Sequence, residues 1–187
     1  IKKSLKNSCP TLITVGNVTE RKGQLNVIKA LPQLLKLYPD LKYHIVGIPT
    51  EQSAFEKAAS ALKVLDCITF HGNVSEEKKQ QLLQESDIFV MLSNNTATGD
   101  VEGFGIAIIE ANAFGLPAIG SIHSGIADAI KDGESGNLVP PMDRDAFVEA
   151  IEKIWVDYDR YQVQAIEWSK HFNWTIIIKK YVAILNT

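Results

Sequence analysis

Residues 87–121, which read DIFVMLSNNTATGDVEGFGIAIIEANAFGLPAIGS, decide the fold of this chain. The apolar runs at 87–92 and 117–121 are short and continuous, which predicts buried strands. Residues 103–115 lie between them and predict a helix that ends at Gly115. Two buried strands joined through a helix form a right-handed parallel crossover. This stretch therefore predicts an α/β domain built around a parallel sheet.

The same alternation of apolar runs and amphipathic segments continues on both sides of this stretch. Further strands are predicted at 11–16, 43–47, 67–72 and 136–140. Helices are predicted at about 24–37, 51–64, 75–85, 125–130, 143–155, 159–170 and 174–185. Ser75 and Asp143 are suitable N-cap residues for two of these helices. The alternation predicts a doubly wound, Rossmann-like sheet with helices on both faces.

The composition is that of one ordinary globular domain. The chain has 187 residues, of which 45% are hydrophobic and 22% are charged, with a formal net charge of -3. Positive and negative residues are mixed along the sequence, so bulk electrostatic binding to nucleic acid is not predicted. The basic opening stretch, about 1–10, is interpreted as a linker from a missing N-terminal portion.

Cysteine and histidine spacing gives no metal pattern. Cys9 and Cys67 lie far apart beside apolar runs and are predicted to be buried free thiols, which fits a reducing, cytoplasmic setting. The four histidines show no ligand spacing with one another, so no protein-bound metal is predicted. They are His44, His71, His123 and His171.

The loop after the first strand can be interpreted in two ways. In a doubly wound sheet, ligands bind beyond the carboxyl ends of the strands. Here the first such loop contains Gly16 and Gly23, which permit tight turns, and Lys22, which directly precedes a helix. A cation at that position opposes the helix dipole unless a bound phosphate compensates it. The alternative is an ordinary solvated basic turn.

The loop after the fourth strand carries two acids around a glycine-rich turn. Gly103 and Gly105 expose backbone amides at the start of a helix, which suits a phosphate, carboxylate or hydroxyl oxygen. Glu102 stands just outside that helix, and Glu110 lies inside a nearly apolar helical stretch, where a carboxylate is costly without partners. The alternative is that Glu102 caps the helix and Glu110 pairs with a buried donor.

In this order, these motifs resemble the C-terminal domain of GT-B-fold glycosyltransferases of the group 1 type, the large retaining family 4. The resemblance covers nearly the whole chain. It is carried by TVGNVTERKG, LKYHIVG, ITFHGNVSEEKKQQLLQESDIFVMLS, EGFGIAIIEANAFGLPAIGS, SGIADAI and DGESGNLVPP. The most specific piece is the E-x7-E signature, which runs from Glu102 to Glu110 with GFG directly after the first acid.

The resemblance implies a donor site and a role for several of its residues. Lys22 resembles the family's lysine on the donor diphosphate, Glu102 its contact with the donor sugar, and Glu110 its carboxylate on the ribose; Glu102 and Lys22 would take part in catalysis. Asn17 departs from the family pattern, where arginine is common, and Arg21 could partly replace that charge. The amides of Ile106 and Ala107 would face the phosphates, and Val74 would lie beside the base. The remaining donor contacts implied are Gly16, Gly103, Phe104 and Gly105.

The resemblance also implies an activity and partners. It predicts transfer of a sugar from a UDP-, GDP- or ADP-sugar to an acceptor hydroxyl with retention of configuration, without a protein-bound cofactor. The acceptor would be a glycan or lipid-linked sugar in polysaccharide or glycolipid synthesis, bound mainly by a missing N-terminal domain. Residues 172–187 resemble a terminal helix that crosses back to that domain. The implied location is cytoplasmic, with peripheral attachment at the inner membrane face in the full-length protein.

Three alternatives share parts of this pattern. A GT-B-fold sugar-nucleotide epimerase would have the same donor half, and a non-catalytic module could bind sugar nucleotides without transferring them. A dinucleotide-dependent oxidoreductase shares the architecture, but GxGxxG is absent after the first strand. The P-loop and the GxSxG elbow are absent as well.

Overall fold

The predicted parallel sheet is present. The computed structural model describes residues 8–94, 102–122 and 124–173, together with Thr175, Ile178 and Val182. Its strands are β1 Thr11–Val15, β2 Lys42–Val46, β3 Ile68–Gly72, β4 Ile88–Met91, β5 Ala118–Ser121 and β6 Gly136–Val139. They form one sheet in the order β3-β2-β1-β4-β5-β6, and every neighbouring pair is parallel. The doubly wound fold class is therefore confirmed.

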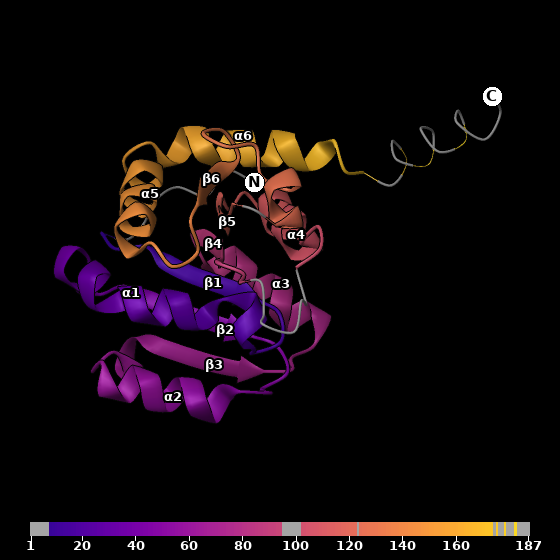
Figure 1. The fold of residues 1–187 in the computed structure, drawn as a ribbon. Helices are drawn as coiled ribbons and strands as arrows, with labels where there is room; N and C mark the ends of the chain where they lie inside the picture. Colours follow the sequence, from indigo (N-terminus) through magenta and orange to yellow (C-terminus); the bar gives the residue numbers. More distant parts are fainter. Residues whose placement is uncertain are drawn as a thin grey trace.

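Helices connect these strands and cover the sheet (Figure 1). The α-helices are α1 Gln24–Leu37, α2 Gln52–Ala61, α3 Glu76–Glu85, α4 Ile106–Ala113, α5 Arg144–Val156 and α6 Tyr158–Lys170. Short 3-10 turns lie at η1 Glu20–Lys22, η2 Leu65–Cys67 and η3 Gly125–Asp128. Thr175, Ile178 and Val182 are also helical, whereas the rest of the terminal segment lies outside the described residues.

Two hydrophobic cores fill the space between the sheet and its helices. One core joins the sheet to α1, α2 and α5 through buried side chains such as Leu31, Phe55 and Phe147. The other joins the opposite face to α3 and α4, with Leu82 and Ile108 among its members. Helix α6 contacts both α5 and α4 and lies across the end of the layered structure (Figure 1). The central strands β1, β4 and β5 are buried on both faces, as their continuous apolar sequences predict, whereas most residues of the edge strand β3 are partly exposed.

Two predicted N-cap residues are confirmed, whereas a third helix begins later than predicted. The side-chain oxygens of Ser75 and Asp143 accept the backbone N–H of Lys78 and Ala146, at 3.3 and 3.0 Å. The helix predicted at 103–115 begins only at Ile106. Its first three predicted residues form a turn instead, because Gly105 adopts a left-handed conformation that ends any helical path.

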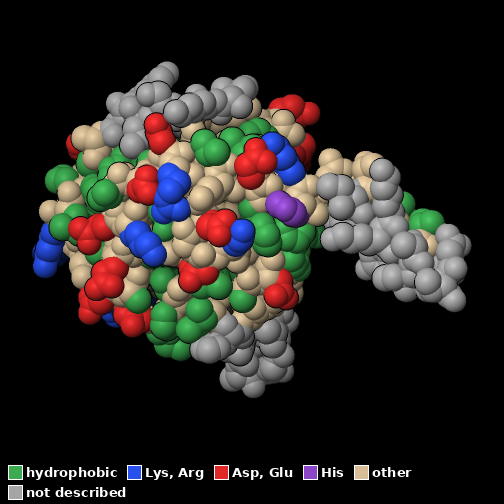
Figure 2. Space-filling view, turned by 90° about the horizontal axis from the view of Figure 1, so that it is seen from above, with side chains coloured by type: hydrophobic (Ala, Val, Ile, Leu, Met, Phe, Trp, Pro, Cys, Tyr) green, Lys and Arg blue, Asp and Glu red, His purple; other side chains and the backbone are tan. Residues whose placement is uncertain are grey.

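The surface and the cysteines show smaller features. Acidic and basic side chains are interspersed over the face seen in Figure 2. Both cysteines are free, but only Cys9 is buried, so the prediction of a buried Cys67 thiol was wrong. Cys67 ends η2 at the start of the edge strand β3, where the sheet is covered from one side only. Within the described ranges, no helix is long and apolar enough to cross a bilayer.

Candidate functional site

A cavity of about 480 Å³ lies at the carboxyl ends of β1 and β4. The strand order reverses at these two strands, since β1 is followed in sequence by β2 on one side and is paired with β4 on the other. A doubly wound sheet offers its ligand crevice at this point. The residues that line the cavity are Val15, Gly16, Lys22, Met91, Glu102, Phe104, Gly105, Ile106, Ala107 and Glu110.

Two glycines allow Lys22 to reach the cavity from the loop after β1. Gly23 has a φ of +77°, and a Cβ on it would lie 1.8 Å from the carbonyl oxygen of Leu92. The loop can therefore turn into α1 directly against the end of β4 only with glycine there. A Cβ on Gly16 would lie 3.1 Å from Cε of Lys22, so the aliphatic stem of the lysine passes close over the end of β1.

Glu102 binds both cations of this loop. Its side chain accepts from Nζ of Lys22 at 2.9 Å and also pairs with the guanidinium of Arg21. Glu102 is only 8% exposed, and the two partners compensate the cost of burying its charge. These three side chains form a charged cluster, of which Lys22 and Glu102 line the cavity. The alternative that Glu102 caps α4 is wrong, because the N-cap residue is Gly105 and no side chain caps the helix.

The first turn of α4 offers backbone donors to the cavity. Ile106 and Ala107 are the first residues of this helix, and their N–H groups have no partner within it. The positive end of the helix dipole lies at the same point, so an anion is favoured there. Ile106 is 67% exposed, which leaves this helix end open.

Glu110 lies at the rim of the cavity and not in the core. Its side chain is 44% exposed and its carboxylate accepts from Nζ of Lys79 on α3 at 3.2 Å. Residue 110 falls on the exposed side of α4, while Ile108 and Ala111 face the core. Partial burial lowers the pKa of Lys79, but hydrogen bonds to Glu76 and Glu110 outweigh this effect and raise its pKa overall.

Comparison of the sequence with known proteins identifies the family of this chain. The sequence model of the family described as Glycosyl transferases group 1 matches residues 1–170. The chain belongs to this family. The amylovoran biosynthesis glycosyltransferase AmsK of Erwinia amylovora is 32% identical over 143 residues, which are 76% of this chain and 35% of that protein.

Two further proteins show how far the similarity extends. The GDP-mannose-dependent alpha-(1-6)-phosphatidylinositol monomannoside mannosyltransferase of Mycolicibacterium smegmatis is 31% identical over 149 residues, 79% of this chain and 39% of that protein. This group 1 glycosyltransferase chain thus spans less than half the length of these curated relatives. The crystal structure of Anabaena HepE in complex with UDP-glucose matches with a TM-score of 0.81 at 21% identity, over 96% of this chain and 49% of that one.

The structure brings together most of the donor-site residues that were singled out from the sequence, but not all of them. Asn17 is exposed, and its carbonyl oxygen accepts from the side chain of Gln24 at 3.0 Å. Val74 packs against the core on the α3 and α4 side and does not line the cavity. Arg21 and Gly103 are also outside the lining, although Arg21 contacts it through Glu102. His123 lies outside the described residues.

Sequence reasoning did not identify Lys79 as the partner of Glu110. Lys79 belongs to an ordinary charged helix, EEKKQQ, and nothing in its local sequence distinguishes it from Lys78. Only the packing of α3 beside α4 makes one of these two lysines a neighbour of the cavity. Within the described part of the chain, no group of three or more histidine, cysteine or acidic side chains could hold a metal ion.

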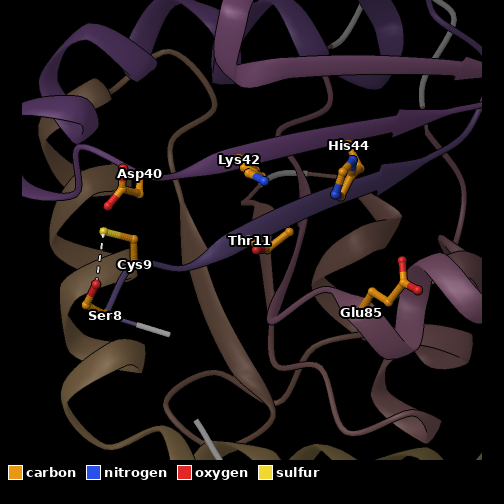
Figure 3. A pocket seen from close by; sticks show the side chains of 7 residues that line it. All are labelled: Ser8, Cys9, Thr11, Asp40, Lys42, His44 and Glu85. Carbon is orange, nitrogen blue, oxygen red and sulfur yellow. Dashed lines mark hydrogen bonds between the residues drawn. The ribbon is translucent and has the colours of Figure 1, made fainter. Parts of the chain in front are cut away.

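A second cavity of about 510 Å³ lies at the opposite ends of the strands (Figure 3). Its side chains come from the starts of β1 and β2 and from the end of α3, and they include Lys42, His44 and Glu85. In Figure 3 these groups stand well apart around the opening and do not converge on one point. None of the described residues that line this cavity begins a helix, unlike Ile106 in the first one. We therefore assign the candidate site to the carboxyl ends of β1 and β4.

Proposed function

We propose that this chain binds the nucleotide-sugar donor for a retaining glycosyltransferase. The observation that supports the proposal is the convergence of Lys22, Glu102, Glu110 and the start of α4 on one cavity. This arrangement combines a cation, backbone amides and two carboxylates. Such groups suit a molecule that carries a diphosphate between two hydroxyl-rich sugars.

The cation and the helix end would bind the diphosphate. Nζ of Lys22 and the amides of Ile106 and Ala107 offer positive charge from two sides of the cavity. When the bond between sugar and diphosphate breaks, negative charge grows on the phosphate oxygens. Groups already placed around that charge stabilise it without reorganising, and this effect usually contributes most to catalysis.

The two carboxylates would select the two sugars of the donor. Glu102, next to the Gly103–Gly105 turn, would accept hydroxyl hydrogens of the transferred sugar and orient it. Glu110, at the outer rim, would accept from the ribose hydroxyls. Since Glu110 already contacts Lys79, the ribose would share the carboxylate with that lysine or displace it.

The acceptor would bind mainly outside this chain. Relatives named for amylovoran synthesis and for mannosylation of a phosphatidylinositol mannoside support an acceptor that is a glycan or a lipid-linked sugar. A further N-terminal domain would hold that acceptor, and the terminal helix of 172–187 would cross back to it. A cytoplasmic enzyme that attaches to the inner membrane face fits such acceptors.

Calorimetric titration of the chain with UDP-glucose, GDP-mannose and ADP-glucose tests the proposal. We expect one of these donors to bind, and Lys22→Ala to weaken its binding by about tenfold or more, because a charge-assisted hydrogen bond is lost. Glu110→Ala should weaken it by a similar factor. Lys131→Ala is the matched control, since Lys131 pairs with Glu134 on the surface and does not line the cavity.

Two outcomes would contradict the proposal. One is that none of the three donors binds at millimolar concentration. The other is that a donor binds with equal affinity to the original chain and to the Lys22→Ala and Glu110→Ala variants, which would place its site elsewhere.

A further inference from the structure

An aromatic cluster joins the end of α6 to the turn at the cavity. The rings of Phe104 and Phe172 lie 5.1 Å apart between centroids, at an interplanar angle of 49°. Phe172 in turn packs edge-on against Trp168, at 5.2 Å and 74°. These separations are within the favourable range for aromatic pairs. Phe104 therefore contacts a residue far along the sequence, just beyond the last turn of α6.

A second set of contacts holds the same turn from the side of η3. A Cβ on Gly125 would lie 2.6 Å from the carbonyl oxygen of Gly103, so η3 begins directly against the backbone of the turn. Trp168 donates its indole N–H to the carbonyl oxygen of Ala129 at the end of η3, at 2.9 Å. The turn, η3 and the end of α6 thus form one packed unit, with Trp168 and Phe172 on its outer side.

Outside these contacts, the described residues hold the turn mainly at its two ends, through the ion pairs of Glu102 and the N–H of Ile108, which donates to the carbonyl oxygen of Gly105. Within the described residues, the amides of Gly103 and Phe104 donate no backbone hydrogen bond, and no side chain caps α4. Phe104 is 37% exposed and lines the cavity, so its ring has the cavity on one side and Phe172 on the other. Glycine on both sides of Phe104 leaves the backbone free to rotate unless packing restrains it.

We propose that Phe172, supported by Trp168, is a positioning residue for the donor sugar. By packing on Phe104 it fixes the Gly103–Gly105 turn, of which Phe104 and Gly105 line the cavity next to Glu102. The inference rests on the proposed function, because it concerns the same site. It adds a contribution from α6, an element that lines no part of the cavity.

The proposal predicts an effect that depends on the sugar. The diphosphate would be bound by Lys22 and by the amides of α4, which packs against α6 along its length and does not need Phe172 for its position. Loss of the Phe172 ring should therefore weaken binding of a nucleotide sugar more than binding of the free nucleoside diphosphate. A merely structural defect would weaken both equally.

Binding of UDP-glucose and UDP, of GDP-mannose and GDP, and of ADP-glucose and ADP to variants of the 187-residue chain tests the inference. For the pair that binds, Phe172→Ala should lower affinity for the nucleotide sugar by about two- to tenfold, as expected for one aromatic pair. Affinity for the free diphosphate should change by less than about twofold. Phe172→Leu should behave like Phe172→Ala and serves if the alanine variant does not fold. Phe172→Tyr, which keeps the ring, should restore sugar binding.

Tyr38→Ala is the matched control. Tyr38 is a partly buried aromatic residue that pairs with Trp155, at 6.4 Å between centroids, away from the cavity. It should leave the ratio of the two affinities unchanged. Equal losses for both ligands in the Phe172 variants, or no loss in either, would overturn the inference while the proposed function stands. Failure of the original chain to bind UDP-glucose, GDP-mannose or ADP-glucose would overturn both.

Discussion

Gly23 carries no functional group, yet it determines where Lys22 stands. Its left-handed backbone and its contact with the carbonyl oxygen of Leu92 let α1 begin against the end of β4. Lys22 then points over β1 toward Glu102. At this scale the cavity depends on a residue that leaves space as well as on residues that carry charge.

Position 23 requires glycine both for its left-handed backbone and for lack of space, and a comparison with Gly133 separates these two requirements. Gly133 has a similar φ of +74°, but a Cβ added there would meet no atom within 4 Å, whereas one on Gly23 would meet the carbonyl oxygen of Leu92 at 1.8 Å. Gly133→Ala should cost about 1–2 kcal/mol for the left-handed conformation alone. Gly23→Ala should add about 1–3 kcal/mol for overpacking. Urea unfolding measures both, and equal costs would show that the loop moves aside without penalty.

Glu102 would compete with the diphosphate of the proposed donor for Arg21 and Lys22, the cations that it binds. Glu102→Gln removes the negative charge between Arg21 and Lys22, so the cluster becomes more positive. We expect the variant to bind free UDP or GDP several-fold more tightly at low salt, with the gain shrinking as salt screens the charges. Titration at two salt concentrations measures this, with Glu134→Gln, at a surface ion pair, as the control. Weaker binding by the Glu102 variant would show that the carboxylate supports the diphosphate site.

Sequence alone could indicate the acids of this site but not their surroundings. The E-x7-E spacing put Glu102 and Glu110 around a glycine turn, and both line the cavity. It did not show that Glu102 is buried and Glu110 exposed, which follows from the start of the helix at Ile106 and its register. The ion pairs of Glu102 join residues 80 and 81 positions apart, which no local pattern encodes.

Among the elements, strands were predicted within a residue or so, whereas the helix at the site was not. The strands are continuous apolar runs between polar loops, so their sequence signal is sharp. For α4 the apolar pattern extends through residues 103–105, although Gly105 adopts a left-handed conformation and the turn there packs against η3 and Phe172. Hydrophobic periodicity carries no information about such tertiary contacts, and so the predicted start of this helix at residue 103 was wrong.

Strands β2 and β3 carry a histidine pair that should make stability depend on pH. Nε2 of His71 lies 3.0 Å from Nδ1 of His44 across the two strands. Burial, followed by the charge of neighbouring groups, lowers the pKa of both side chains. Between the lowered pKa values and the unfolded value of about 6.5, the unfolded chain binds more protons. The free energy of unfolding should therefore fall as the pH drops below about 6.5.

Urea unfolding at about pH 5 and pH 7, on either side of the ordinary histidine pKa, tests this expectation. The double variant His44→Gln with His71→Gln should lose less stability between the two pH values than the original chain does. His171→Gln, at an exposed position on the end of α6, should retain the original difference. An unchanged pH dependence in the double variant would contradict the assignment to this histidine pair.

At the scale of the whole molecule, the sheet joins two halves that each contribute one side of the cavity. The first half supplies β1 and the loop with Lys22, and the second supplies β4, the glycine turn and α4. The alternation of strands and helices was enough to predict the sheet and its ligand-binding edge. It could not predict that a larger cavity lies at the opposite edge, because cavities depend on how loops pack.

A donor that bridges the two halves should stabilise the entire fold. At a donor concentration of about 100 times Kd, binding to the native state adds about 2.7 kcal/mol. For a domain of this size that corresponds to a rise in Tm of about 5–10 °C. Thermal unfolding with the tightest-binding donor measures it, and the Lys22→Ala variant should show a smaller rise at the same concentration. A donor that binds by calorimetry but leaves Tm unchanged would contradict a site formed only in the native state.

The strand order also has a consequence for synthesis of the chain. Because β1 pairs with β4, the cavity beside Lys22 can form only after residues 88–110 have left the ribosome. The aromatic neighbour of Phe104 emerges later still, at position 172. If the chain binds a sugar nucleotide as proposed, a nascent chain should gain that affinity only after residue 172 has emerged, and capture of the ligand by stalled chains of increasing length would date that moment.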